Sequence, residues 1–216
     1  MPSRRIHQAD ALEWLAQPDV LRGGSVITSL PDWSELPELS LEAWQRWFTD
    51  AAALVLSRID DDAVAMFFQS DVRHEGVWID KAALVQRAAD RVGTTLLFHK
   101  VVCRRPAGTV TFGRASYSHL VGYSKRLRPA LRRATADVLP DGGFQPGPKS
   151  MGVLACVDAC RFVRDETTTR LVIDPFCGLG TVLAVANQLG LDAIGVDRSA
   201  RMCRRARTLS LAERLA

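Results

Sequence analysis

Near its C-terminal end the chain reads LVIDPFCGLGT over residues 171–181, and this stretch decides the fold. Its three apolar leading residues predict a buried strand. Gly178 and Gly180 then allow a sharp turn and a close approach of the backbone to a ligand. A predicted helix follows Thr181, and its first N–H groups have no partner inside the helix. A strand, a glycine loop and a helix in this order are typical of α/β folds that bind nucleotides.

An acidic residue follows at the separation that such a loop requires. A second apolar run, residues 193–196, leads to Asp197, 19 residues after Gly178 (197 minus 178). Roughly 20 residues separate a glycine loop from the acid that binds a ribose. Asp197 is therefore expected to bind ribose hydroxyls or to cap the next helix. Asp174 adds a negative charge that disfavours a diphosphate and favours a cationic ligand such as S-adenosylmethionine (SAM), which carries sulfonium and ammonium groups.

The rest of the chain alternates between strand-like and helix-like segments. Predicted strands cover residues 25–28, 63–69, 94–102, 118–123, 170–173 and 193–196. Predicted helices begin after Asp10, Ser40 and Asp80, and further helices cover residues 150–163, 182–189 and 199–211. This alternation predicts an α/β fold with a mostly parallel, twisted sheet and helices on both faces.

The composition is that of one globular domain. The 216 residues are 47% hydrophobic and 24% charged, and the net charge of +4 permits a nucleic-acid partner. No apolar run approaches the roughly 20 residues of a membrane helix, and the first residues do not form a signal-peptide core. We therefore expect a cytoplasmic enzyme with no membrane partner. The five scattered cysteines predict neither a disulfide framework nor a metal site.

The glycine loop also resembles that of a known family. Asp-Pro-Phe-Cys-Gly-Leu-Gly-Thr (174–181), with a strand ending in Gly-Val-Asp (195–197), is similar to the cofactor site of the SAM-dependent amino-methyltransferases that modify adenine or cytosine in DNA. Residues 145–150 (QPGPKS) resemble the family's Pro-x-x-Lys-Pro segment, with Ser150 in place of the last proline. The resemblance implies a Rossmann-like methyltransferase fold and SAM as cofactor. The residues it implies for binding SAM in this half are Lys149, Ser150, Asp174, Pro175, Phe176, Cys177, Gly178, Gly180, Thr181, Asp197 and Arg198.

The start of the chain resembles the family's catalytic half. Residues 6–15 (IHQADALEWL) and 25–32 (SVITSLPD) are similar to its Gly-Asp-x-x-x-x-Leu segment and to the catalytic turn that follows. By this resemblance Asp10, Ala11 and Thr28 would contact the cofactor. Because the turn precedes the cofactor loop, the chain resembles the circularly permuted branch. The implied division of the single domain 1–216 is a catalytic half (1–124), a basic Pro/Gly-rich loop (125–147) and a SAM-binding half (148–216).

The catalytic turn departs from the family's polar-Pro-Pro-aromatic pattern. Here it reads Ser29-Leu30-Pro31-Asp32, and Trp33 follows one place later. In the family the polar side chain and a proline carbonyl hold the target amino group, and the aromatic ring stacks on the flipped base. Three interpretations stay open. Trp33 stacks from a shifted turn, Asp32 acts directly as proton acceptor or hydrogen-bond partner, or the site is degenerate.

Basic and polar residues suggest how a nucleic acid would be held. Lys125, Arg126 and Arg128 are predicted to contact phosphates, and Asp71 and Arg73 follow a strand end near the expected site. The span 125–149 is too short for a folded target-reading domain, which favours RNA, with tRNA first, over DNA. A DNA amino-methyltransferase without its own target-recognition domain is the alternative. A non-catalytic SAM-binding or assembly protein is the second alternative. Monomer and homodimer are both open.

Overall fold

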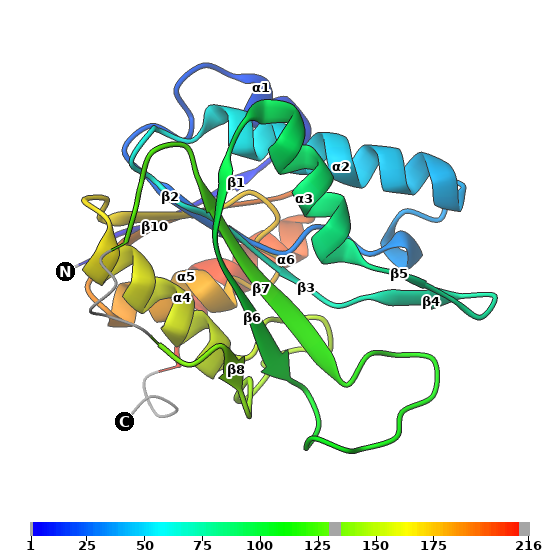
Figure 1. The fold of residues 1–216 in the computed structure, drawn as a ribbon. Helices are drawn as coiled ribbons and strands as arrows, with labels where there is room; N and C mark the ends of the chain where they lie inside the picture. Colours follow the sequence, from blue (N-terminus) through cyan, green and yellow to red (C-terminus); the bar gives the residue numbers. More distant parts are fainter. Residues whose placement is uncertain (1, 130–134, 212–216) are drawn as a thin grey trace.

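The computed structural model describes residues 2–129 and 135–211. Its main sheet has eight strands in the order β1-β10-β9-β2-β3-β7-β6-β8, and β4 pairs with β5 in a separate hairpin (Figure 1). The strands are β1 (Arg4–Gln8), β2 (Ser25–Thr28), β3 (Ala65–Gln69), β4 (Val72–His74), β5 (Val77–Ile79), β6 (Thr95–Cys103), β7 (Tyr117–Ser124), β8 (Val138–Leu139), β9 (Leu171–Asp174) and β10 (Asp192–Asp197).

Helices cover both faces of the sheet. They are α1 (Ala11–Ala16), α2 (Leu41–Arg58), α3 (Lys81–Val92), α4 (Val153–Glu166), α5 (Thr181–Gln188) and α6 (Ala200–Thr208), with a short 3-10 turn, η1 (Trp33–Glu35). On one face α1, α2 and α3 enclose Trp44 and Phe48, and on the other α4, α5 and α6 enclose Val182 and Leu183 (Figure 1). This confirms the predicted class, an α/β fold with a mostly parallel sheet between two layers of helices.

Strand direction brings the important segments to one edge of the sheet. The five strands β1, β10, β9, β2 and β3 run parallel, β7 is antiparallel to β3, and β6 is antiparallel to β7. The segments that follow the parallel strands therefore meet at the edge where those strands end, here called the carboxyl edge. Ligands bind at this edge in open α/β sheets.

Several elements differ from the prediction, among them β4 and β5, which were not predicted. β1 was not predicted, because as an edge strand it carries exposed polar residues such as Arg5 and His7. β8 lies inside the segment 125–147, which was predicted to be a loop, and pairs with β6 at Val101 and Val102. Residues 130–134 of that segment lie outside the described residues. α4 begins three residues later than predicted, because carbonyls of the preceding segment 142–144 accept its first N–H groups.

The helix starts agree with the sequence. The side chains of Asp10, Ser40 and Asp80 accept backbone N–H groups at the starts of α1, α2 and α3, as their positions predicted. Among the described residues, no helix has both the length and the apolar character that crossing a membrane requires.

Candidate active site

The turn after β2 and the glycine loop after β9 lie side by side at the carboxyl edge. β2 and β9 are neighbouring parallel strands, with Val26 opposite Ile173. The last residue of β2, Thr28, donates from its hydroxyl to Asp174 Oδ1 at 2.7 Å, and both residues are buried. The same oxygen accepts the Phe176 N–H at 3.1 Å. The Asp174 carboxyl group therefore links the turn after β2 to the glycine loop, although these segments are far apart in the sequence.

Burial changes the expected role of Asp174. The sequence predicted that the Asp174 charge faces a cationic ligand. The side chain is only 3% exposed, so it does not face an open ligand site. Loss of water raises the pKa of this carboxyl to about 7, although the hydrogen bonds from Thr28 and Phe176 act in the opposite direction. Asp174 instead lies beneath the glycine loop and holds it against the turn.

Asp197, at the end of β10, binds the glycine loop directly. Its Oδ2 accepts the Gly178 N–H at 3.1 Å, and its Oδ1 accepts the Ser199 N–H at 2.7 Å where α6 begins. The carboxylate therefore holds the turn that leads into α6. The N-cap of that helix is Ser199 and not Asp197, which corrects one of the two predicted roles of Asp197. It is half-buried beside the loop, and ribose binding stays a prediction.

The two glycines of the loop have different surroundings. Gly178 and Gly180 have φ angles of 51° and 76°, in the left-handed region that favours glycine. A Cβ atom at Gly180 would lie 2.9 Å from the Ala206 Cβ, because α6 packs on the loop. At Gly178 nothing lies within 4 Å of the Cβ position, so the space beside it is open. Thr181 has a buried hydroxyl with no hydrogen-bond partner in the described structure. Open space and an unpartnered polar atom fit a loop that takes a ligand.

The other residues that were predicted to bind the cofactor differ in how far they are buried. Pro175 and Cys177 are buried in the loop, and burial raises the pKa of the Cys177 thiol, as expected for a packing residue. The Phe176 ring packs edge-on against Trp47 at 6.1 Å. The remaining three lie at the ends of β1 and β10: Asp10 and Arg198 are exposed, and Ala11 is buried.

Segment 145–150 connects the glycine loop to the turn. A Cβ atom at Gly147 would lie 2.6 Å from Leu179 Cδ1, so the segment packs on the loop. On its other side Lys149 Nζ lies 3.5 Å from Glu35 Oε2, and Glu35 Oε1 accepts the Asp32 N–H at 3.0 Å. Lys149 therefore reaches the turn after β2 through Glu35, as well as lying near the loop.

A cavity of about 260 Å³ opens between the turn and the end of β3. We call it the turn cavity. The Ser29 hydroxyl makes no hydrogen bond with the described residues, so it is available to a ligand there. Side chains from five separate segments line this space, among them Ser29, Leu30, Asp32, Gln69, Ser70, Asp71, Arg73, Lys81, Arg104, Arg114, Gln145, Lys149 and Ser150.

Comparison with known proteins agrees with this geometry. Residues 164–208 match the family model of the N6/N4 methyltransferases, described as DNA methylase. This segment of the chain therefore resembles the DNA methylases. The matched segment contains β9, the glycine loop, α5, β10 and α6, and therefore the whole cofactor loop. No curated protein matches the sequence significantly.

Solved structures share the fold over nearly the whole chain. A Thermus thermophilus protein, provisionally named a DNA modification methylase and complexed with S-adenosyl-L-methionine, is 20% identical, with a TM-score of 0.72 over 99% of this chain and 95% of that one. The cytosine-N4-specific PvuII DNA methyltransferase is 17% identical, with a TM-score of 0.72 over 98% and 88%. The M1.HpyAVI–SAM complex is 13% identical, with a TM-score of 0.63 over 94% and 98%. These likenesses establish the SAM-dependent methyltransferase fold, while the circular permutation stays a prediction.

Lys81 is a residue of the candidate site that sequence reasoning missed. It is the first residue of α3 and is 3% exposed, and its Nζ lies 3.4 Å from Asp32 Oδ2 and 5.6 Å from the centre of the Trp44 ring. Burial lowers its pKa, and the carboxylates of Asp32, Asp71 and Glu35 counteract that decrease. A lysine in the first turn of a helix is normally a surface residue, so no local signal marked it.

The turn points Asp32, not Trp33, toward the cavity. The Trp33 indole Nε1 donates to the Leu39 carbonyl at 2.9 Å, and its ring packs edge-on against His74 at 4.7 Å. The neighbouring Pro31 carbonyl accepts from the Trp44 indole at 3.2 Å. The geometry therefore favours direct action of Asp32 over base stacking by Trp33.

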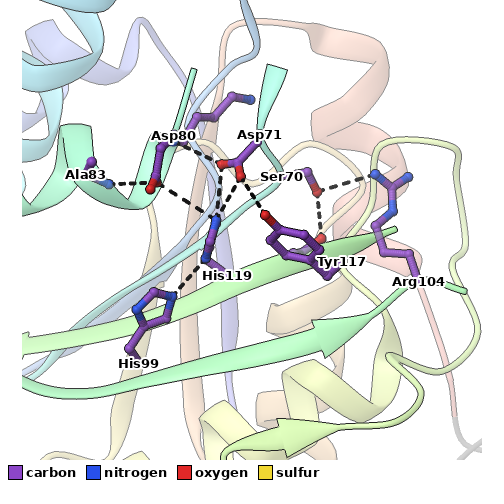
Figure 2. A network of polar contacts seen from close by, with 10 residues as sticks. Ser70, Asp71, Asp80, Ala83, His99, Arg104, Tyr117 and His119 are labelled. Carbon is purple, nitrogen blue, oxygen red and sulfur yellow. Dashed lines mark hydrogen bonds and ion pairs between the residues drawn. The ribbon is translucent and has the colours of Figure 1, made fainter. Parts of the chain in front are cut away.

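Asp71 lines the cavity within a network of polar side chains (Figure 2). Its carboxylate accepts His119 Nε2 at 3.1 Å and the Tyr117 hydroxyl at 3.3 Å. Because Nε2 donates, His119 Nδ1 accepts from His99 Nε2 at 2.8 Å. Burial opposes ionisation of Asp71, but the hydrogen bonds from His119 and from the Lys81 amide outweigh it and lower the pKa. These hydrogen bonds hold the Asp71 side chain in place at the cavity.

The same network contains a group of possible metal ligands. Ligand atoms of Asp71, Asp80 and His119 lie within 4.8 Å of one another. The hydrogen bond between His119 and Asp71 accounts for this arrangement, so we assign it no metal.

Gln69 is a second residue that the sequence did not place in the site. It ends β3, lines the turn cavity and is 1% exposed. Its Nε2 has no hydrogen-bond partner among the described residues. Leaving a buried donor unpaired costs about 1–3 kcal/mol, and a ligand in the cavity would supply the missing acceptor.

The basic run at the end of β7 lies away from the site. β7 is antiparallel to β3, so Ser124 lies near the start of β3, at the edge opposite the turn cavity. Lys125 donates to two carbonyls at the end of α2, Arg126 lies 3.2 Å from Asp61, and Arg128 donates to Thr95 at 3.1 Å. This placement contradicts the predicted substrate contacts, because the strand direction, which the sequence did not reveal, carries these residues away. Arg73 remains at the cavity.

Proposed function

We propose that this methyltransferase transfers a methyl group from SAM to the exocyclic amino nitrogen of adenine or cytosine in DNA. The observation that carries the proposal is the 2.7 Å hydrogen bond from Thr28 to Asp174, which holds the glycine loop beside the turn that begins at Ser29. Methyl transfer requires the acceptor nitrogen in line with the donor carbon, so most of the rate gain comes from positioning. Two loops joined through a buried carboxyl group provide a fixed geometry for it.

SAM fits the residues around the glycine loop. The open space beside Gly178 admits a ligand, and the Thr181 hydroxyl and the Asp197 carboxylate offer polar contacts. In the proposed arrangement Asp197 binds the ribose, Asp10 the adenine, and Lys149 with Ser150 lies against the methionine part. When bound, SAM supplies the methyl group. The SAM complexes of two structural neighbours support this cofactor.

The turn cavity supplies the groups that an amino acceptor needs. The Ser29 hydroxyl and the Leu30 carbonyl would hold the amino group, and the Gln69 amide would bind the ring edge. A methylated amino nitrogen must lose a proton, and in this proposal the Asp32 carboxylate accepts it. Lys81, 3.4 Å from Asp32, is a positioning residue that orients this carboxylate.

The absence of a nearby thiol also favours an amino nitrogen. Methylation at a ring carbon of a pyrimidine requires a covalent adduct with a nucleophile such as cysteine. Among the residues that line the turn cavity in the described structure there is no cysteine.

DNA is favoured over the RNA that the sequence suggested. That expectation came from the short span 125–149, which leaves no room for a folded reading domain. The Thermus protein is covered over 95% by this chain and is nevertheless named as a DNA modification methylase, so small size does not argue for RNA. The family model is also that of DNA methylases.

Transfer from radiolabelled SAM to unmodified duplex DNA, single-stranded DNA and total RNA tests the proposal. We expect label in DNA, recovered after digestion as N6-methyl-deoxyadenosine or N4-methyl-deoxycytidine. Asp32→Asn should lower kcat by about 100-fold, the lower range for loss of acid–base catalysis, and leave the Kd for S-adenosylhomocysteine unchanged. Lys81→Met should lower kcat less and shift its pH profile, since it acts through Asp32.

Glu38→Gln is the matched control, because Glu38 is an exposed acid close to the turn. It should leave both kcat and cofactor binding unchanged. Label in RNA alone would overturn the DNA assignment. Binding of S-adenosylhomocysteine without transfer to any nucleic acid would favour the non-catalytic alternative.

A further inference from the structure

Two projections extend from the carboxyl edge beside the turn cavity. The hairpin arm is the β4–β5 hairpin (72–79), and the loop arm is the connection 104–116 between β6 and β7 (Figure 1). A backbone bridge between Val72 and Arg114 joins the two arms. Val72 and Arg73 of one arm, with Gly113 and Arg114 of the other, line the cavity itself. Anything held by the arms therefore lies at the mouth of the proposed acceptor site.

Both arms expose large apolar side chains. On the hairpin arm Val77 is 66% and Trp78 is 50% exposed, and on the loop arm Val110 is 79% and Phe112 is 93% exposed. These four are half of the eight large hydrophobic residues that are exposed in the described part of the chain. A phenylalanine so exposed adds almost no packing to the fold. Its clustering with others next to a catalytic cavity marks a contact surface for another molecule.

Four arginines without acidic partners among the described residues lie on the same two arms. Arg105 and Arg114 are exposed on the loop arm, Arg104 begins that arm, and Arg73 packs over the Trp78 ring at 5.8 Å. No carboxylate of the described residues lies within 4.0 Å of any of these four guanidinium groups. Arg104 donates to Ser70 at 3.4 Å instead (Figure 2).

Arg104, Arg105 and Arg114 also lie close enough to repel one another. Burial lowers the pKa of Arg104, and the positive charges of Arg114 and Arg105 lower it further. A cluster of like charges that the protein itself does not neutralise is complementary to a polyanion. Combined with exposed aromatic rings, it suits a nucleic acid better than an acidic peptide, because both base stacking and phosphate contacts are available.

We propose that the two arms form a clamp for duplex DNA at the turn cavity, an inference that rests on the proposed function. Arg105 and Arg114 contact phosphates of the target strand. Phe112 inserts into the duplex and occupies the place of the nucleotide that turns out into the cavity, as apolar side chains do when they enter a base stack. In this proposal the arginines of the arms make the phosphate contacts that had been predicted for residues 125–128.

Binding of a fluorescently labelled duplex DNA to the full chain tests the clamp. Anisotropy is measured across a series of KCl concentrations, with S-adenosylhomocysteine present. The double variant Arg105→Ala/Arg114→Ala should weaken binding by about 10-fold or more at low salt, and should reduce the slope of log Kd against log salt by about 2. Phe112→Ala should weaken binding by about 10-fold and leave the slope unchanged, because it removes stacking and no charge.

The matched control is Arg201→Ala/Arg204→Ala, which removes the same charge from exposed positions on α6. It should change the Kd less than about twofold, since counterion release comes from contacted phosphates. Equal weakening by the two double variants would show a general charge effect and overturn the clamp. If Phe112→Ala binds duplex DNA as tightly as wild type does, Phe112 does not insert into the base stack.

Failure of the clamp and failure of the proposed function look different. Wild-type protein that transfers methyl groups to DNA, with arm variants that bind and methylate normally, would overturn the clamp alone. Wild-type protein that binds duplex DNA through the arms but transfers no methyl group would overturn the proposed function alone. Binding of RNA and not duplex DNA would overturn DNA as the occupant. Thermal unfolding and S-adenosylhomocysteine binding, expected to be unchanged in each variant, verify the fold.

Discussion

Replacing Asp174 by asparagine changes the buried carboxyl group that joins the turn to the glycine loop. Asparagine keeps an oxygen to accept from Thr28 and Phe176 but cannot ionise. The folded-state pKa of Asp174 is raised from 3.8 to about 7, chiefly by burial. A difference of about three pH units, at 1.36 kcal/mol each, corresponds to about 4 kcal/mol. Because the folded state binds this proton more tightly, its stabilising effect is complete below pH 3.8 and is lost as pH rises to about 7.

The difference in the pH dependence of stability between wild type and Asp174→Asn therefore reports on this one group. Between about pH 5 and about pH 8 the wild type should lose about 3 kcal/mol of unfolding free energy through Asp174, and the asparagine variant should not. Urea denaturation of both proteins at the two pH values measures the effect. All other ionisable groups are shared, so their contributions cancel in the difference. We expect the stability of Asp174→Asn relative to wild type to increase by about 3 kcal/mol over this range.

Asp62→Asn provides the matched control, since Asp62 is an exposed acid on the opposite edge of the sheet, before β3. Its stability relative to wild type should change by less than about 0.5 kcal/mol between the two pH values. If Asp174→Asn shows an equally flat difference, the carboxyl group is not titrating with a raised pKa. Asp174 would then not be sealed from water beneath the glycine loop.

Three further substitutions test single contacts of the site. Thr28→Val removes the donor to the buried carboxyl group and should cost about 1–3 kcal/mol in urea denaturation, with a larger cost at about pH 8, where the acceptor is charged. Gln69→Leu removes an unpaired buried amide, so stability should stay equal or increase by about 1 kcal/mol while kcat/KM falls about 10-fold; an unchanged rate would contradict its role at the ring edge. Gly180→Ala should lower thermal stability by about 1–3 kcal/mol, because the backbone is left-handed and the new Cβ would lie 2.9 Å from Ala206. Gly190→Ala, at a φ of 83° in open space, should show the smaller backbone cost alone.

Much of the fold is written in short windows of the sequence. The glycine loop, the caps at Asp10, Ser40 and Asp80, and most strands were predicted, because each depends on the conformational and hydrogen-bonding preferences of a few consecutive residues. The turn at Ser29 was recognisable for the same reason. Its unusual Asp32 was visible in the sequence, but the residue that Asp32 faces was not.

Tertiary structure decided which distant residues meet. Lys81 reaches Asp32 only because α3 packs beside the turn, and Gln69 lines the cavity only because β3 adjoins β2. Strand direction alone moved the basic run after β7 to the far edge and brought the loop arm to the cavity. The sequence by itself determined a glycine loop similar to that of the DNA methylases, and a turn after β2, since both are local signals. Burial of Asp174, the partner of Asp32 and the surface offered to DNA depend on contacts between segments far apart in the chain, which only the folded sheet establishes.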